Sequence, residues 1–257
     1  VKNALLAYAW DEESGYFGYA VQGQEGVHIL RTEAGENYNK GVDGVTPLIA
    51  GICSKEQEKQ LLKHLKSPEE LWSTVGISTV DMSASYYYDN GYWNGSVWCP
   101  YQYFLWKAML DIGEGQFAFD IAHRGLNSWK QEIEFSYNTF EMIQIETERG
   151  GWFHQFSGLS TPISIWYNAY YKRGTLTTGY DTWIEKKEIS EDVDHAEIVY
   201  STTGTHTGAL LIVMNSLYHY DVEIDGQKAE FIEREKGVIE ITLNRKEGVI
   251  IIYRDEK

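Results

Sequence analysis

Glu141 is the acidic residue whose neighbours in the sequence best suit acid–base chemistry. Phe140 precedes it, and Met142 and Ile143 follow it, so its surroundings are apolar. If Glu141 faces inward, loss of solvent raises the pKa of its carboxyl group, as in carboxylates tuned for catalysis. If the segment is a regular strand, alternate positions are buried and Glu141 is exposed. Glu141 would then be one of several solvated surface acids, together with Glu132, Glu134, Glu146 and Glu148. Among these, Glu146 is the nearest alternative candidate for a catalytic carboxylate.

Aromatic side chains are abundant and could bind a ligand. The chain holds 9 Trp, 19 Tyr and 9 Phe, and they are densest between Tyr86 and Trp106. Much of this must be core, yet flat aromatic faces also suit the C–H faces of sugars, while Tyr and Trp keep a polar edge. Gly91 and Gly95 allow close backbone approach beside Trp93, which favours a loop that lines a pocket.

Other acidic residues allow weaker interpretations. Asp81 and Asp89 flank the aromatic loop and either bind sugar hydroxyls or simply solubilise the loop. Asp192, Asp194 and His195 resemble a metal cluster, but a turn at the edge of a strand explains them equally well. We expect no metal site and no cofactor, because the sequence has no P-loop, dinucleotide fingerprint or Ser nucleophile elbow.

Composition limits the classes of partner. The 257 residues are 43% hydrophobic, enough for a packed core, and the net charge is -16 from 38 acidic and 22 basic residues. That charge opposes binding to nucleic acid or to an anionic membrane. No apolar run approaches the roughly 20 residues of a membrane span, so we expect a soluble protein, cytoplasmic or exported with a leader outside this chain. Cys53 and Cys99 are expected to be free thiols.

The first part of the chain carries helix signals. They predict about five helices: one after a capping box of Ser54 and Gln57, a short one over 67–70, one opened by Pro100 and closed by Gly113, one over 116–129, and one from Thr161 to Gly174. Residues 1–10 are typical of the end of a helix. A small hairpin is expected from 10–19 and 27–32.

The second part of the chain changes to strand-like runs near residues 175–182. Strands are expected over 196–200, 209–214, 222–224, 238–243 and 249–253, with a hairpin turn at Asp225-Gly226. We therefore predict an α+β multidomain chain. Its domains are 1–178, which is helical, and 179–257, a small antiparallel β-sandwich-like accessory domain.

Three ordered segments resemble glycoside hydrolase family 63 and its relatives, which are built as six-hairpin (α/α)6 toroids. In this chain they read Trp10-Asp11-Glu12-Glu13-Ser14-Gly15-Tyr16-Phe17, Gly44-Val45-Thr46-Pro47-Leu48, and Tyr92-Trp93-Asn94-Gly95-Ser96-Val97-Trp98. Their order and spacing match over roughly residues 8–172. The resemblance implies that 1–178 is the C-terminal half of an incomplete toroid.

The resemblance also carries residue roles onto this chain. Phe140-Glu141-Met142 takes the place of the family's catalytic segment, so Glu141 is the candidate catalytic base. The family's third motif has Arg where this chain has Asn94, so a charged contact expected there is absent. The substrate-binding candidates are Tyr92, Trp93, Asn94, Gly95, Trp98, Asp89, His154, Gln155 and Phe156. His154 and Gln155 could equally well make structural hydrogen bonds.

The activity implied by the resemblance is exo-acting, inverting hydrolysis of α-linked glucosides or related oligosaccharides. Inversion needs a second carboxyl group as general acid, which in the family lies upstream of the Trp-Asp segment. The expected partners are therefore an oligosaccharide substrate and the upstream half of the toroid, in the same or another chain. The alternatives are a non-catalytic carbohydrate-binding or scaffold module, and phosphorolysis on the same toroid.

Overall fold

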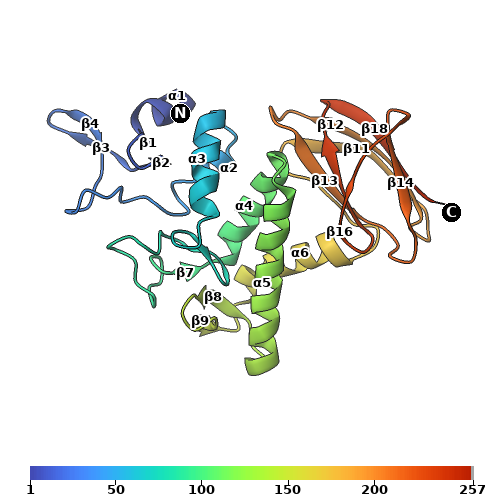
Figure 1. Ribbon diagram of the computed structural model, residues 1–257. Helices are drawn as coiled ribbons and strands as arrows, with labels where there is room; N and C mark the ends of the chain where they lie inside the picture. The colour runs from blue at the N-terminus through green and yellow to red at the C-terminus, as the bar shows by residue number, and fades with distance from the viewer. Residues whose placement is uncertain (256–257) are drawn as a thin grey trace. The chain divides into compact units, whose positions relative to one another are not determined.

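The computed structural model describes residues 1–255 and combines helices with antiparallel sheets, which confirms the α+β class (Figure 1). The chain forms two compact units that interleave in sequence: Val1–Phe104 with Arg124–Thr161, and Leu105–His123 with Pro162–Lys257. Six α-helices occur within the described residues. Since six hairpins require twelve helices, the toroid stays a prediction, as does the boundary between residues 178 and 179.

Three helices lie in the N-terminal part of the chain: α1 (Lys2–Tyr8), α2 (Thr46–Ile49) and α3 (Lys55–Leu65). The capping box predicted ahead of α3 is confirmed: the Gln57 amide donates to the Ser54 hydroxyl, and the Ser54 amide donates to the Gln57 side chain. Leu61 and Leu65 are fully buried on one face. The cap therefore fixes where this helix begins and which face it packs.

The short helix predicted over 67–70 is wrong, because the segment is a turn. The amides of Glu70, Leu71 and Trp72 all donate to the single carbonyl of Ser67. Three donors on one acceptor close a turn but leave no ladder for a helix to continue. The chain passes instead into β5 (Trp72–Ser73), which pairs with β6 (Gly76–Ile77).

The longer helices are α4 (Cys99–Asp111), α5 (Gly115–Ser136) and α6 (Thr161–Tyr171). Pro100 and Pro162 lie in the first turns of α4 and α6, as expected, since proline lacks an amide that those turns do not need. Gly113 ends the segment of α4 with a φ of 77°. Helix α5 extends beyond the predicted range. No helix within residues 1–255 is long and apolar enough to cross a membrane.

Short strands connect the helices of the first compact unit. Two separate hairpins replace the single one predicted, β1 (Trp10–Asp11) with β2 (Tyr16–Phe17), and β3 (Ala20–Gly23) with β4 (Gly26–Ile29). A three-stranded sheet joins β7 (Ser96–Val97), β8 (Phe140–Gln144) and β9 (Gly150–His154) in that order. Glu141 lies on its central strand.

The C-terminal part is built from two antiparallel sheets. One has the order β10-β13-β17-β16 and the other β11-β12-β18-β14-β15. Their bounds are β10 (Leu176–Thr177), β11 (Thr182–Ile189), β12 (His195–Thr202), β13 (Gly208–Val213), β14 (Tyr220–Ile224), β15 (Gln227–Lys228), β16 (Ile232–Glu235), β17 (Val238–Leu243) and β18 (Glu247–Arg254).

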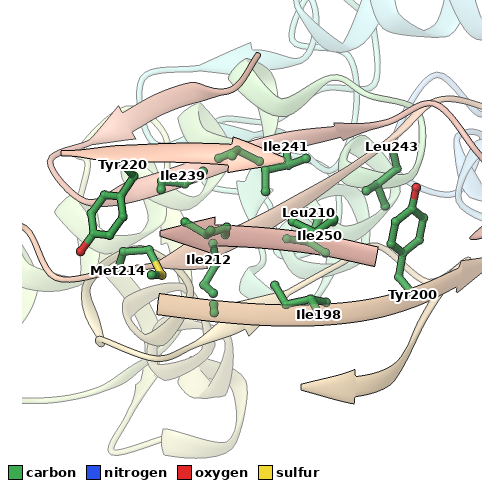
Figure 2. Packing of buried hydrophobic residues seen from close by; sticks show 13 residues of the cluster. Ile198, Tyr200, Leu210, Ile212, Met214, Tyr220, Ile239, Ile241, Leu243 and Ile250 are labelled. Carbon is green, nitrogen blue, oxygen red and sulfur yellow. The ribbon is translucent and has the colours of Figure 1, made fainter. Parts of the chain in front are cut away.

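Inward-facing side chains of both sheets form one apolar core. Figure 2 shows Ile198 and Ile250 from one sheet near Leu210, Ile212 and other side chains of the second sheet. Thirteen residues belong to this cluster, and all are buried. The predicted Asp225-Gly226 turn is present, and both residues have positive φ, 51° and 74°, as a two-residue hairpin requires.

Candidate active site

The aromatic loop of residues 86–98 is held by its own backbone. The Tyr88 amide donates to the Asn94 carbonyl over 2.9 Å, and the Gly91 amide donates to the Tyr88 carbonyl over 2.7 Å. A Cβ atom at Gly95 would collide with the Tyr88 carbonyl, so only glycine fits there. The Asn94 amide group donates to the Tyr86 carbonyl over 2.9 Å. Asn94 therefore helps to shape the loop in the place where the family has Arg.

Two tryptophans of this loop stack on each other. The rings of Trp93 and Trp98 have centroids 4.0 Å apart and an interplanar angle of 6°. Trp98 is buried and its indole N–H donates to the Tyr92 carbonyl over 2.9 Å, whereas Trp93 is 51% exposed. Trp98 thus backs a flat aromatic surface that Trp93 presents to solvent.

Glu141 is buried although it lies on a strand. Phe140 and Met142 on either side of it are also buried, so β8 is covered on both faces. Strand β9 carries a bulge here: Phe140 pairs with His154 and Met142 with Gly151, so two residues of β9 lie opposite Glu141. One of them, Trp152, has a φ of 61°. Because both faces of β8 are covered, Glu141 is buried where a half-exposed strand would leave it in solvent.

The two carboxylate oxygens of Glu141 have different environments. The Tyr92 hydroxyl donates a short hydrogen bond to Oε1. Oε2 is buried and has no hydrogen-bond partner within residues 1–255. The hydrogen bond to Glu141 raises the pKa of Tyr92, which keeps the phenol protonated as a donor. The Trp152 ring meets the Tyr92 ring edge-on, with centroids 5.0 Å apart.

A cleft of about 480 Å³ lies beside the aromatic loop. Tyr86, Trp93 and Asn94 of the loop line it, and its other aromatic residues lie outside the loop: Tyr19, Tyr38 and Tyr101. Glu141 is not among the lining residues. Tyr92 connects the two features, because its hydroxyl binds Glu141 while its ring lies 5.7 Å from that of Trp93.

Asp43 is the one carboxylate among the lining residues that the structure describes, and the sequence had given no reason to single it out. The Tyr19 hydroxyl donates to it over 2.9 Å. Burial, followed by this hydrogen bond, raises the pKa of Tyr19 to about 12. The tyrosines of the cleft were also missed, because nothing in the sequence brings positions 19, 38 and 101 together. The only signal was the high total number of tyrosines.

Several sequence candidates lie away from the cleft. Asp89 is exposed, and its carboxylate accepts the Asn90 amide over 2.9 Å. His154, Gln155 and Phe156 are exposed at the end of β9 or just after it. The structure does not bring them to the cleft lining, so their contact with substrate stays a prediction.

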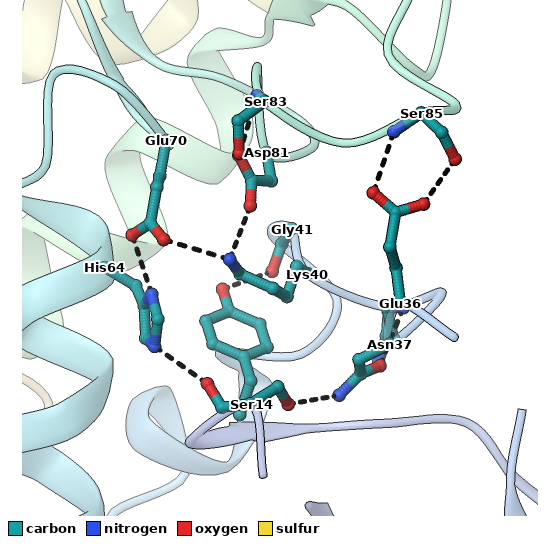
Figure 3. A network of polar contacts seen from close by, with 12 residues as sticks. Ser14, Glu36, Asn37, Lys40, Gly41, His64, Glu70, Asp81, Ser83 and Ser85 are labelled. Carbon is teal, nitrogen blue, oxygen red and sulfur yellow. Dashed lines mark hydrogen bonds and ion pairs between the residues drawn. The ribbon is translucent and has the colours of Figure 1, made fainter. Parts of the chain in front are cut away.

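Asp81 is 2% exposed, so it does not solubilise the loop, and it does not line the aromatic cleft. Lys40 forms ion pairs with Asp81 over 2.5 Å and with Glu70 over 3.0 Å, as Figure 3 shows. The Ser83 amide and hydroxyl donate to the second oxygen of Asp81. All of its accepting capacity is used within the protein. The described residues contain no group of three or more His, Cys, Asp or Glu side chains arranged to hold a metal ion.

Comparison with known proteins identifies relatives of this chain. The sequence profile of the mannosylglycerate hydrolase MGH1-like glycoside hydrolase domain matches residues 1–141. No curated protein sequence matches the chain. Among solved structures, the family 63 mannosylglycerate hydrolase of Thermus thermophilus in complex with glucose is similar, with a TM-score of 0.51 and 21% identity over 65% of this chain and 38% of that one.

A second structure of that hydrolase, in complex with Tris and D-glycerate, gives a TM-score of 0.51 and 21% identity over 65% of this chain and 37% of that one. At this identity the likeness shows the fold alone, and the chain spans less than two fifths of its relative's length. The profile covers more than half of this chain, which confirms the resemblance found in the sequence. The chain belongs to the mannosylglycerate hydrolase MGH1-like glycoside hydrolase family.

Proposed function

We propose that this chain is part of a glycoside hydrolase in which Glu141 is the general base. One observation carries the proposal: the buried carboxylate of Glu141 has one oxygen fixed by the Tyr92 hydroxyl and the other left without a partner in the described chain. A buried acceptor that the fold leaves unpaired costs free energy. A site that must bind a water molecule gains from an acceptor of this kind.

The proposed chemistry is inverting hydrolysis. Water held by Oε2 of Glu141 attacks the anomeric carbon, and the carboxylate takes the proton of that water as the bond to the departing oxygen breaks. The general acid, about 6.5–9.5 Å from the base in such enzymes, protonates the departing oxygen. We assign it to the upstream half of the protein, in the same or another chain. Tyr92 keeps Oε1 in place, so that Oε2 faces the water.

The substrate we propose is an uncharged oligosaccharide, attacked from its end and bound through α-linked glucose or a related sugar. The exposed face of Trp93 and four tyrosines provide surfaces for sugar rings, and Asp43 accepts hydroxyl protons. No Lys, Arg or His belongs to the described lining residues, and Asn94 stands where the family has Arg. Both facts favour a neutral sugar over one with a carboxylate, such as the mannosylglycerate of the family's name.

The helices are proposed to be part of an (α/α)6 toroid, with 1–178 as its C-terminal half and 179–257 as a β-rich accessory domain. The connection from α4 to α5 spans only residues 112–114, and short connections favour antiparallel neighbours. Limited proteolysis of the protein that carries this chain should cut near residues 178–179 and leave two stable fragments. Cleavage elsewhere only, with loss of both fragments, would contradict this boundary.

Glu141→Gln in the protein that carries this chain tests the proposed base. Turnover should fall by about 10³-fold or more, while sugar affinity is retained, because the amide keeps the shape but cannot take a proton. Glu146→Gln is the matched control, since Glu146 is exposed a few residues further on. Near-normal rates in Glu141→Gln would remove Glu141 from the mechanism. NMR of the first product anomer reports whether the reaction inverts.

A non-catalytic carbohydrate-binding module is the second candidate. One observation favours such a module: Glu141 is not among the residues that line the aromatic cleft. Calorimetry with oligosaccharides and a hydrolysis assay on the same preparation distinguish the two functions. Binding without hydrolysis, unchanged in Glu141→Gln, would support the module over the enzyme. Phosphate dependence of cleavage would indicate phosphorolysis instead.

A further inference from the structure

A second pocket, of about 600 Å³, lies in the β-rich part of the chain. It is formed by β11, β12, β18 and the turn after β14, and its lining residues differ from those of the aromatic cleft. Its polar side chains are those of Glu185, Tyr200, Ser201, Asp225, Arg245 and Glu247. No role proposed above uses this pocket.

Tyr200 supplies a buried hydroxyl that nothing in the described chain satisfies. Its side chain is 1% exposed and packs in the core between the sheets, at one end of the cluster in Figure 2. Its hydroxyl has no hydrogen-bond partner within residues 1–255. Gly248 pairs directly with Tyr200, and a Cβ atom there would lie 3.2 Å from the hydroxyl oxygen. Glycine therefore adds no side-chain atom between the hydroxyl and the pocket.

The groups around this hydroxyl are already held in place. Arg245 forms an ion pair of 2.6 Å with one oxygen of Asp225, and the Val249 amide donates to the other over 2.9 Å. Burial raises the pKa of Tyr200, and the negative charge of Asp225 raises it further, so the phenol stays a donor. Prearranged donors and acceptors lose little freedom on binding a ligand.

The charges of the pocket restrict its ligand. Glu185, Asp225 and Glu247 oppose the single guanidinium of Arg245, so the described lining has an excess of two negative charges. An anion would be repelled. An apolar ligand would bury these charges and the Tyr200 hydroxyl without partners. A molecule with several neutral hydroxyl groups can instead donate to the carboxylates and accept from Arg245 and Tyr200.

An exposed aromatic side chain lies beside these polar groups. Trp183 of β11 pairs with Ser201 of β12, which in turn pairs with Glu247 of β18. Directly paired residues place their side chains on the same face of a sheet. Trp183 is 62% exposed, so its ring is available on the face that holds the Ser201 hydroxyl, which donates to Glu185 over 2.6 Å.

We propose that this pocket is a second carbohydrate-binding site, which takes one neutral sugar unit of an oligosaccharide. Tyr200, Arg245 and the carboxylates bind its hydroxyls. Trp183 lies outside the pocket lining, on the sheet face of Ser201 and opposite to Tyr200, and adds an aromatic surface next to the pocket. The site stands on the β-rich part alone and holds whether or not Glu141 is catalytic. Its role would be to keep a glycan on the protein apart from the cleft that contains Trp93.

Calorimetric titration with maltotriose, cellotriose and mannotriose tests the site, using the protein that carries this chain with Trp93→Ala to weaken binding in the cleft. At least one probe should bind with a single saturable phase, and glucuronate should not. Tyr200→Phe should weaken that binding about tenfold, because one hydrogen bond is lost. Trp183→Ala should weaken it less, because Trp183 lies outside the pocket lining. Tyr253→Phe is the matched control, because its hydroxyl binds Glu223 on the same sheet.

Thermal unfolding separates binding from folding in these variants. Tyr200→Phe removes an unpaired buried hydroxyl, so the free protein should unfold at the same or a higher temperature while sugar binding falls. Hydrolysis of a short soluble substrate should be unchanged by Tyr200→Phe in the protein without the Trp93 substitution. The proposal is overturned if no neutral probe binds, if glucuronate binds as tightly, or if Tyr200→Phe binds like the Tyr253→Phe control.

Discussion

The carboxylates around Lys40 and the buried carboxylate of Glu141 lie in the same compact unit but differ in how their oxygens are used. Asp81 and Glu70 share Lys40, Glu70 also contacts His64 over 2.7 Å, and the remaining oxygen of Asp81 accepts from Ser83 (Figure 3). Glu141 is as inaccessible as many core residues, at 7% exposed, yet only one of its oxygens has a partner in the described chain.

The carboxylates around Lys40 have a structural role. Burial acts to lower the pKa of Lys40, but the hydrogen bonds to Asp81 and Glu70 outweigh it, so the pKa is raised and the ion pairs persist. These groups hold three segments of the chain together. Glu141 instead has one oxygen without a partner in the described chain, and this difference is the reason we propose Glu141, and not Asp81, as the reactive carboxylate.

The largest effect on activity is expected when Glu141 is replaced, and it should come without a loss of stability. In Glu141→Gln the rate should fall by about 10³-fold or more, while the free energy of unfolding should stay equal or rise, because a buried charge is removed. Urea unfolding beside the hydrolysis assay measures both. If the free energy of unfolding fell by more than about 2 kcal/mol, Glu141 would have a structural role like that of Asp81 and Glu70, and the proposed difference between them would be wrong.

The opposite behaviour is expected of Asp81→Asn. Lys40 would keep only Glu70 as an acidic partner, and the free energy of unfolding should fall by about 3 kcal/mol, the usual result of breaking a buried ion pair. Urea unfolding measures the loss. Preparations that remain folded should keep sugar affinity, since Asp81 does not line the aromatic cleft. Lost affinity at full stability would make Asp81 a ligand contact.

Glu132 offers a pH-dependent version of the same test. It is 2% exposed and binds Arg149 over 2.7 Å. Burial acts to raise its pKa, but the hydrogen bonds from Arg149, Ser136 and the Gly150 amide and the charge of Arg149 together outweigh this, and the pKa lies below its usual 4.5. Its stabilisation is therefore present above about pH 4.5 and is lost as the pH falls through the lower, folded-state pKa.

Glu132→Gln should accordingly lower the free energy of unfolding by about 2 kcal/mol at pH 7. The gap between the variant and the parent protein should shrink as the pH falls from about 4.5 to 3, because the parent's carboxylate becomes protonated. Urea titrations at several pH values follow the gap. A gap that stays constant with pH would show that the charge of Glu132 contributes nothing.

The smallest effect is expected of Tyr92→Phe. Removing the hydroxyl frees Oε1 of Glu141 without changing the ring, so the rate should fall about tenfold through poorer orientation of the carboxylate. An unchanged rate would exclude Tyr92 as a positioning residue.

The parts of the fold that the sequence predicts best are those set by local chemistry. The Ser54 cap, Pro100 at the start of α4 and the Asp225-Gly226 turn depend on residues next to each other, and all are present. The segment over 67–70 failed because its hydrogen bonds converge on one carbonyl. Capping residues, prolines and turn residues indicate where a helix or turn begins and ends, but they do not tell whether a turn continues into a helix.

The candidate site was only partly predictable, because it depends on distant contacts. The aromatic loop and Glu141 were found from motifs, but the burial of Glu141 depends on the cover of both faces of β8. The ion pair of Asp81 joins it to Lys40, far back in the sequence, and Asp43 meets Tyr19 in the same way. No pattern within a short window carries these pairings.

The bulge at Trp152 makes the side chains that lie opposite Glu141 depend on the number of residues in β9 as well as on their identity. Removing a single residue from β9 would leave one residue opposite Glu141 instead of two. Replacing Trp152 keeps that count, whereas a one-residue deletion does not. Within this family, changes of length in the hairpin of β8 and β9 should therefore be rarer than changes of sequence.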